Sequence, residues 1–134
     1  MKLSELDNKP KYNFFSNFSF AVDGLKDMLV NETSFKLDLI FFVIFSIISY
    51  LVPFSITYRL ILFFSLFFPL FSEIINSALE RLVDLFTTEY NIQAKRIKDI
   101  GASLVILSFF VTFLLWLIVF KINFKHIIHF LNEI

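Results

Sequence analysis

Four polar residues recur along one helical face in the middle of the chain, and three of them are acids. Glu73, Asn76, Glu80 and Asp84 are separated by 3, 4 and 4 residues, so at about 100° per residue they lie within an arc of roughly 80°. Carboxylates without histidine or cysteine suit a hard cation, Mg²⁺ above all. This polar stripe therefore predicts a magnesium-dependent site.

The composition around the polar stripe is that of a membrane protein. Hydrophobic residues make up 57% of the 134 residues, 21 are phenylalanine, and the mean hydropathy is +0.77. A chain of this size cannot bury so much apolar surface in one aqueous core, so lipid must cover part of it. The net charge of zero, without a basic patch among aromatics, argues against nucleic-acid binding. The absence of cysteine excludes disulfides and thiolate metal sites.

The pattern predicts an all-α membrane protein that begins with a short polar tail. Residues 1–13 are predicted to be a flexible cytoplasmic tail, and residues 14–134 one membrane-embedded domain. Apolar residues recur every three or four positions over 14–30, with charges opposite, which predicts an amphipathic helix lying in the membrane surface. A helix packed on a partner protein is the alternative.

Three further segments are long and apolar enough to cross a hydrocarbon core about 30 Å thick. They cover approximately residues 36–52, 59–86 and 99–120, and residues 39–58 and 100–120 contain no charged residue. Pro69 cannot donate a hydrogen bond to Ser65, so it predicts a kink one turn before Glu73.

The positions of basic residues predict the orientation in the membrane. Eight Lys and Arg residues lie in the N-terminal region and the second loop, against three on the other side, so the N-terminus is expected in the cytoplasm and the C-terminus outside. With Arg59 at the outer interface, a rise of about 1.5 Å per residue places Glu73 about 21 Å and Glu80 about 32 Å further in. Glu73 then lies within the inner leaflet and Glu80 reaches cytoplasmic water.

A carboxylate at the depth of Glu73 must face protein, an ion or a cavity. Three spanning helices are too few to enclose the polar stripe, so we expect an oligomer, and small residues beside the stripe and over 101–103 favour close helix contacts. Lys98 and Asp99 precede these small residues directly. A lysine beside a helix N-terminus at this interface suits phosphate oxygens.

The order of these residues resembles the signature of the bacterial integral membrane diacylglycerol kinases and undecaprenol kinases. The residues that carry the resemblance are E-I-I-N-S-A-L-E at 73–80, V-D at 83–84, E-Y at 89–90 and K-D-I-G-A at 98–102. The resemblance extends from about residue 20 to residue 116. It implies a homotrimeric bundle in the bacterial inner membrane, with three spanning helices per chain and active sites shared between chains.

The resemblance also implies a reaction and roles for individual residues. Members transfer the γ-phosphoryl group of MgATP to the primary hydroxyl of a lipid. Glu73 is similar to the catalytic base, Asn76 to the residue that keeps the site aligned, and Glu32 and Glu80 to the ligands of Mg²⁺ on ATP. The positions that match nucleotide contacts are Glu32, Glu80, Glu89, Tyr90, Asn91, Lys98 and Asp99, with Asn91 standing where many members have histidine. Those expected along the lipid substrate are Lys36, Arg59, Glu73 and Trp116.

Alternatives to diacylglycerol phosphorylation come from inside and outside this family. The segment N-E-T-S-F at 31–35 favours the diacylglycerol-using branch, and undecaprenol is the alternative lipid. A small cation channel or transporter would need a polar path to the outer side, yet residues 59–71 offer only Ser65. A catalytically inactive relative is the third hypothesis, and it would fail to bind MgATP.

Overall fold

The computed structural model describes residues 13–132, and every element in this part of the chain is helical. Of the tail predicted over residues 1–13, residues 1–12 lie outside the described residues, and Asn13 is the N-cap of α1. The helices are α1 (Phe14–Asn31), α2 (Thr33–Leu51), α3 (Ile56–Ser65), α4 (Phe67–Phe86), α5 (Ile92–Ile122) and α6 (Phe124–Asn132). The all-helical fold predicted from the sequence is confirmed for this part of the chain.

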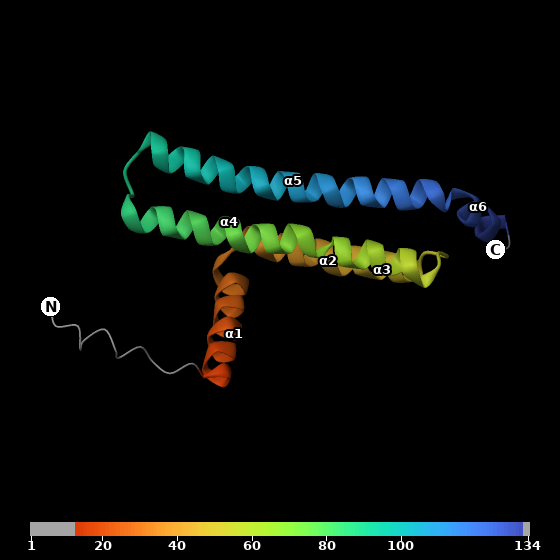
Figure 1. Cartoon of the computed structure of the whole chain (residues 1–134), viewed down its shortest axis with the longest axis horizontal. Coiled ribbons are helices and arrows are strands. Elements are labelled where there is room, and N and C mark those ends of the chain that lie inside the picture. Colours follow the sequence, from red (N-terminus) through yellow and green to blue (C-terminus); the bar gives the residue numbers. More distant parts are fainter. Residues whose placement is uncertain (1–12, 133–134) are drawn as a thin grey trace.

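Three helical stretches are long and apolar enough to cross a membrane, as predicted: α2, the consecutive pair α3 and α4, and α5. They run side by side along the long axis of the molecule, whereas α1 points away across that axis (Figure 1). Half of the most apolar stretch of α3–α4 is buried, against 11% for both α2 and α5. The helix pair that carries the polar stripe is therefore the centre of the bundle.

The third spanning helix begins earlier than predicted, at Ile92 instead of residue 99. Asn91 causes this, because its side-chain oxygen accepts hydrogen bonds from the backbone N–H groups of Gln93 at 2.8 Å and Ala94 at 3.3 Å, as a helix N-cap does. The basic residues near Lys98 are therefore helical. The predicted helix N-terminus beside Lys98 was wrong, since the backbone N–H groups there already serve the interior of α5.

The second spanning helix is interrupted at Leu66, between α3 and α4, close to the kink that Pro69 predicted. Proline cannot donate to the carbonyl of Ser65, and Thr112 of α5 does so instead, with its hydroxyl 3.0 Å from that oxygen. The Trp116 indole donates to the Ser65 hydroxyl at 3.2 Å. The interruption thus ties α5 to the central helix pair by two hydrogen bonds.

Replacing Thr112 with valine is expected to lower the free energy of unfolding by about 1–3 kcal/mol, because the buried Ser65 carbonyl would lose its partner. In the background of Pro69→Ala, the new N–H of residue 69 can serve this carbonyl, so Thr112→Val should cost less. Unfolding of the four variants in detergent, followed by circular dichroism, measures the difference. If Thr112→Val lowered the free energy of unfolding equally with proline and with alanine at position 69, this explanation would be wrong.

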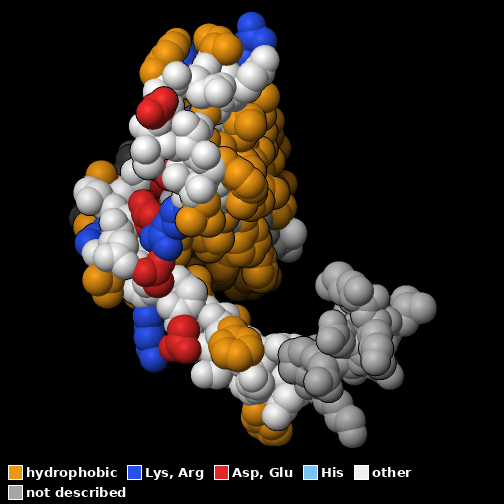
Figure 2. Space-filling view, turned by 90° about the vertical axis from the view of Figure 1, so that its left-hand side faces the viewer, with side chains coloured by type: hydrophobic (Ala, Val, Ile, Leu, Met, Phe, Trp, Pro, Cys, Tyr) orange, Lys and Arg blue, Asp and Glu red, His pale blue; other side chains and the backbone are white. Residues whose placement is uncertain are grey.

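Few large apolar side chains are fully buried within the described residues. One cluster joins α1, α2 and α4 through Met28, Phe35 and Leu70, and another joins the opposite end through Phe54, Leu62 and Val119. Charged side chains gather on the face that Figure 2 presents, beside a large apolar surface. That surface is available to lipid or to neighbouring chains.

Candidate functional site

Four carboxylates gather around the middle of α4. Glu73 is only 6% exposed, and its Oε1 lies 3.4 Å from the donating hydroxyl of Ser77. Glu80 lies about two turns further along the same face of α4, and Glu32 lies at the α1–α2 junction. Both are close enough to act electrostatically on Glu73. Asp38 of α2 lies within the electrostatic reach of Glu73 as well. The structure therefore brings together Glu73 and the two residues predicted to hold the metal.

Asn76 connects this acidic cluster to α5. Its side-chain N–H donates to Glu80 Oε1 at 3.0 Å, and its Oδ1 is buried without a hydrogen-bond partner in the described part of the chain. Oδ1 lies directly over Gly101, because a Cβ built on that glycine would be 2.3 Å away from it. The lack of a side chain at Gly101 is what lets Asn76 occupy this position and orient Glu80.

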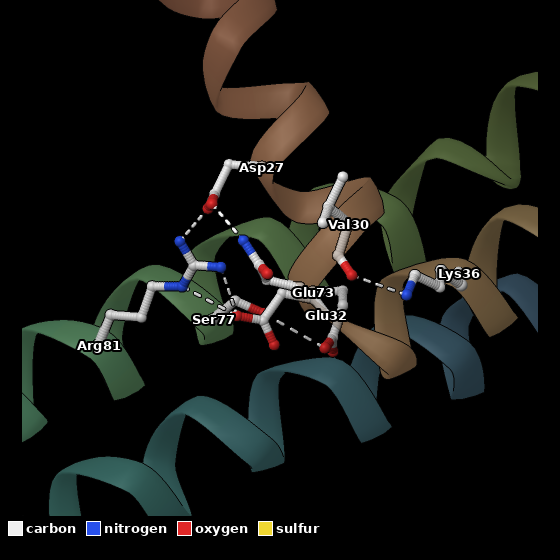
Figure 3. A network of polar contacts seen from close by, with 8 residues as sticks. Asp27, Val30, Glu32, Lys36, Glu73, Ser77 and Arg81 are labelled. Carbon is white, nitrogen blue, oxygen red and sulfur yellow. Dashed lines mark hydrogen bonds and ion pairs between the residues drawn. The ribbon is translucent and has the colours of Figure 1, made fainter.

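A second set of polar contacts joins α1, α2 and α4, and Figure 3 shows it from close by. The guanidinium group of Arg81 donates to Glu32 at 2.6 and 2.8 Å and forms an ion pair with Asp27. Asn31 donates to the same aspartate at 2.5 Å. The Lys36 ammonium group donates to the Val30 carbonyl at 2.9 Å. These contacts fix the direction of α1 at its junction with α2.

Acidification is expected to weaken the attachment of α1 to α4. The hydrogen bonds from Arg81 and then from Asn31 lower the pKa of Asp27 below the ordinary value of 3.8. Because the pKa of Asp27 is lower in the folded state, its charged form stabilises the fold fully above pH 3.8. This stabilisation is lost as the pH falls through the lowered pKa of the folded state. Spin labels on cysteines introduced at Leu25 and Ala78 should move apart below that pH. Arg81→Gln should abolish the pH dependence.

The predicted nucleotide contacts gather at the connection between α4 and α5. A cavity of about 310 Å³ is lined there by residues that include Glu89, Tyr90, Asn91, Lys98 and Asp99. The Lys98 ammonium group donates to Asp84 at 2.6 Å, and Lys95 donates to Asp99 at 2.5 Å. Glu32 and Glu80 do not line this cavity. The structure thus joins five of the seven predicted nucleotide residues and leaves the other two beside Glu73.

The residues predicted along the lipid lie at different levels of the bundle. Arg59 donates to the Tyr50 carbonyl at 3.3 Å, between α2 and α3, about 21 Å along the helices from Glu73. Trp116 is beside Ser65, about 12 Å from the level of Glu73. Lys36 is exposed near the junction of α1 and α2. One chain therefore does not bring Arg59 and Trp116 to Glu73, and the lipid contacts of these residues and of Lys36 stay predictions.

No group of three or more acidic or histidine side chains with a geometry suited to a metal ion occurs among the residues that the structure describes. Mg²⁺ on a nucleotide needs fewer, because it usually takes one or two carboxylates and completes its coordination with phosphate oxygens and water. Glu80 is oriented by Asn76 and Glu32 by Arg81. Two carboxylates are what such an ion takes from a protein, and the binding of Mg²⁺ by this pair stays a prediction.

Sequence reasoning assigned no role to Asp38 or Arg81. Asp38 lies inside the first spanning helix with Oδ2 buried and without a partner among the described residues, and an ionisable residue inside a span is itself a sign of function. Arg81 gave no comparable signal, because its partners lie 49 and 54 positions earlier in the chain.

One comparison with known proteins gives a match that covers most of the chain. A family model described as prokaryotic diacylglycerol kinase matches residues 19–120, which include α2 to α4 and nearly all of α5. No curated protein matches the chain significantly. The matched part contains the acidic cluster and the cavity at the α4–α5 connection. The chain therefore belongs to the prokaryotic diacylglycerol kinase family.

Proposed function

We propose that the protein transfers the γ-phosphoryl group of MgATP to the primary hydroxyl of 1,2-diacylglycerol, giving phosphatidic acid. The observation that carries the proposal is the position of Glu73, a buried carboxylate in a membrane-spanning helix, beside the more exposed Glu80 and Glu32. Membership of a lipid kinase family gives this arrangement its chemical meaning. The reaction needs one group that meets a lipid hydroxyl and others that meet a water-soluble nucleotide.

In the proposed reaction each part of the site has a separate task. Glu73 accepts the proton of the lipid hydroxyl as the hydroxyl oxygen attacks the γ-phosphorus, the bond from the γ-phosphorus to the bridging oxygen breaks, and ADP leaves. Glu32 and Glu80 hold Mg²⁺, which neutralises charge on the phosphates when bound. Lys98 leaves Asp84 to meet the phosphates, and Glu89, Tyr90, Asn91 and Asp99 of the α4–α5 cavity contact the nucleotide. Phosphoryl transfer depends mainly on such positioning and charge neutralisation.

The proposed setting is a homotrimer in the bacterial inner membrane with its nucleotide end in the cytoplasm. The basic residues Lys95, Arg96 and Lys98 are at that end, which supports a cytoplasmic location. In α1, Phe14, Phe15, Phe18 and Phe20 are 62–80% exposed, which supports a position in the membrane surface. The large exposed apolar area of α2 and α5 supports packing against neighbouring chains, which would enclose the site.

The lipid is tested by offering one preparation of the purified protein diacylglycerol and undecaprenol separately with MgATP. We expect phosphatidic acid to form much faster than undecaprenyl phosphate, in accordance with the sequence N-E-T-S-F at 31–35. A large preference for undecaprenol would replace the lipid in this proposal. Failure to phosphorylate either lipid, together with failure to bind MgATP, would indicate an inactive relative.

A further inference from the structure

Arg81 holds one oxygen of Glu32 and leaves the other one free of the contact. Its Nε and Nη2 both donate to Glu32 Oε1, at 2.8 and 2.6 Å, and its Nη1 reaches Asp27. Figure 3 shows the guanidinium group between α1 and the α1–α2 junction. Neither of these hydrogen bonds uses Oε2 of Glu32. A carboxylate held in this way can still bind a cation through its second oxygen.

The local structure around Glu32 does not fix its side chain. Glu32 is the single residue between α1 and α2, with an extended backbone, and its side chain makes no capping hydrogen bond. Its charge is also repelled by Glu73, which favours rotamers directed away from the acidic cluster. Arg81, from a different part of the chain, provides the charged contact that holds the Glu32 carboxylate near this cluster.

We propose that Arg81 is a positioning residue for the divalent cation that accompanies the nucleotide. It binds Glu32 Oε1, keeps the side chain beside the acidic cluster and leaves Oε2 to bind the metal. The inference rests on the proposed function, in which Glu32 is a metal ligand. Arg81 itself touches neither the metal nor the reacting atoms.

Two opposite effects of Arg81 on metal affinity must be compared. Its positive charge repels a cation, but the side chain is 45% exposed, and exposed charge interactions change an affinity by up to about fivefold. Loss of the residue that orients a metal ligand usually weakens metal binding by about 10–100-fold. Orientation is therefore the larger effect, and removing Arg81 should weaken metal binding.

The experiment is a titration of the full chain in detergent with Mn²⁺ and a non-hydrolysable ATP analogue, followed by electron paramagnetic resonance. We expect Arg81→Gln to raise the Kd for Mn²⁺ about tenfold. Arg81→Lys keeps the charge and one of the contacts, so it should recover part of the affinity. Asp27→Asn, the matched control, should stay within about twofold, because Nε and Nη2 of Arg81 still hold Glu32.

Two outcomes would contradict the proposal. An unchanged or lower Kd in both Arg81 variants would show that repulsion outweighs orientation. If Asp27→Asn raised the Kd for Mn²⁺ as much as Arg81→Gln does, the effect would come from the attachment of α1 and not from the orientation of Glu32. If Arg81→Gln does not fold, as judged by circular dichroism, the Kd for Mn²⁺ of Arg81→Lys is compared with that of Asp27→Asn instead. Because Mn²⁺ binding is measured without a lipid, failure of the lipid assay would count against the proposed reaction alone.

Discussion

Replacing Glu73 with glutamine is expected to lower phosphoryl transfer by at least about 100-fold, because a general base contributes roughly 10²–10⁴-fold. Glutamine has nearly the same shape and its oxygen can still accept from Ser77, but it cannot take up the proton of the lipid hydroxyl. The change also removes a negative charge from the group formed with Asp38, Glu32 and Glu80. Folding should therefore be unaffected or slightly stabilised. Transfer of labelled phosphate to diacylglycerol measures the loss.

The matched control is Asp23→Asn, which also changes an acid to its amide. Asp23 is 64% exposed and, among the residues that the structure describes, pairs only with Lys26 on the same helix, at 3.6 Å. Exposed pairs of this kind contribute little. Its activity should equal that of the unmodified protein. Activity of Glu73→Gln within about tenfold of the unmodified protein would contradict a role as general base, provided that circular dichroism shows the helices intact.

A methyl group added at Gly101 is expected to disturb both the fold and the reaction. The new Cβ would lie 2.3 Å from Asn76 Oδ1, so Asn76 or α5 must move, at a cost of about 1–3 kcal/mol in the free energy of unfolding. Displacing Asn76 also removes the hydrogen bond that orients Glu80. Gly101→Ala should therefore lower activity at least about tenfold. Thermal unfolding in detergent and the kinase assay measure the two effects.

Gly24 provides the matched control, because a Cβ built there meets no atom within 4 Å. Gly24→Ala should leave activity unchanged and should stabilise α1, since alanine favours helix by about 1 kcal/mol. In the background of Asn76→Ala, the collision at Gly101 disappears. Gly101→Ala should then be tolerated by the fold, while activity stays low. If Gly101→Ala lowered the free energy of unfolding by the same amount in that background, Asn76 would not be the residue that is displaced.

Much of the fold could be predicted because it follows from local patterns. The spans that contain Glu73 and Trp116 are evident from hydropathy, and the place of Pro69 predicted the interruption between α3 and α4. The start of α5 was missed although Asn91 is a typical N-cap, because the polar residues near Lys98 suggested a loop. Hydropathy marks the part of a helix inside the membrane and does not report how far the helix extends into water.

In the candidate site, too, contacts within one helix could be predicted and contacts between helices could not. Periodicity predicted that Glu73, Asn76 and Glu80 share a helical face, and the structure adds a hydrogen bond from the Asn76 side chain to Glu80. The role of Asn76 in aligning the site stays a prediction. Periodicity did not predict that Asp38 lies within the electrostatic reach of Glu73, since that depends on how α2 lies against α4. Nor could periodicity predict the salt bridge between Asp84 and Lys98.

The sequence by itself determined that the chain is helical, that three stretches suit a membrane, and that acidic residues lie along the face of the middle one. These properties depend on residues within a few turns of one another, so the helical repeat reveals them. The tertiary structure alone decided that Arg81 binds Glu32, that Thr112 serves the carbonyl freed by Pro69, and that Asn76 lies on Gly101. Contacts of this kind depend on the register between helices, which side-chain packing across distant segments sets.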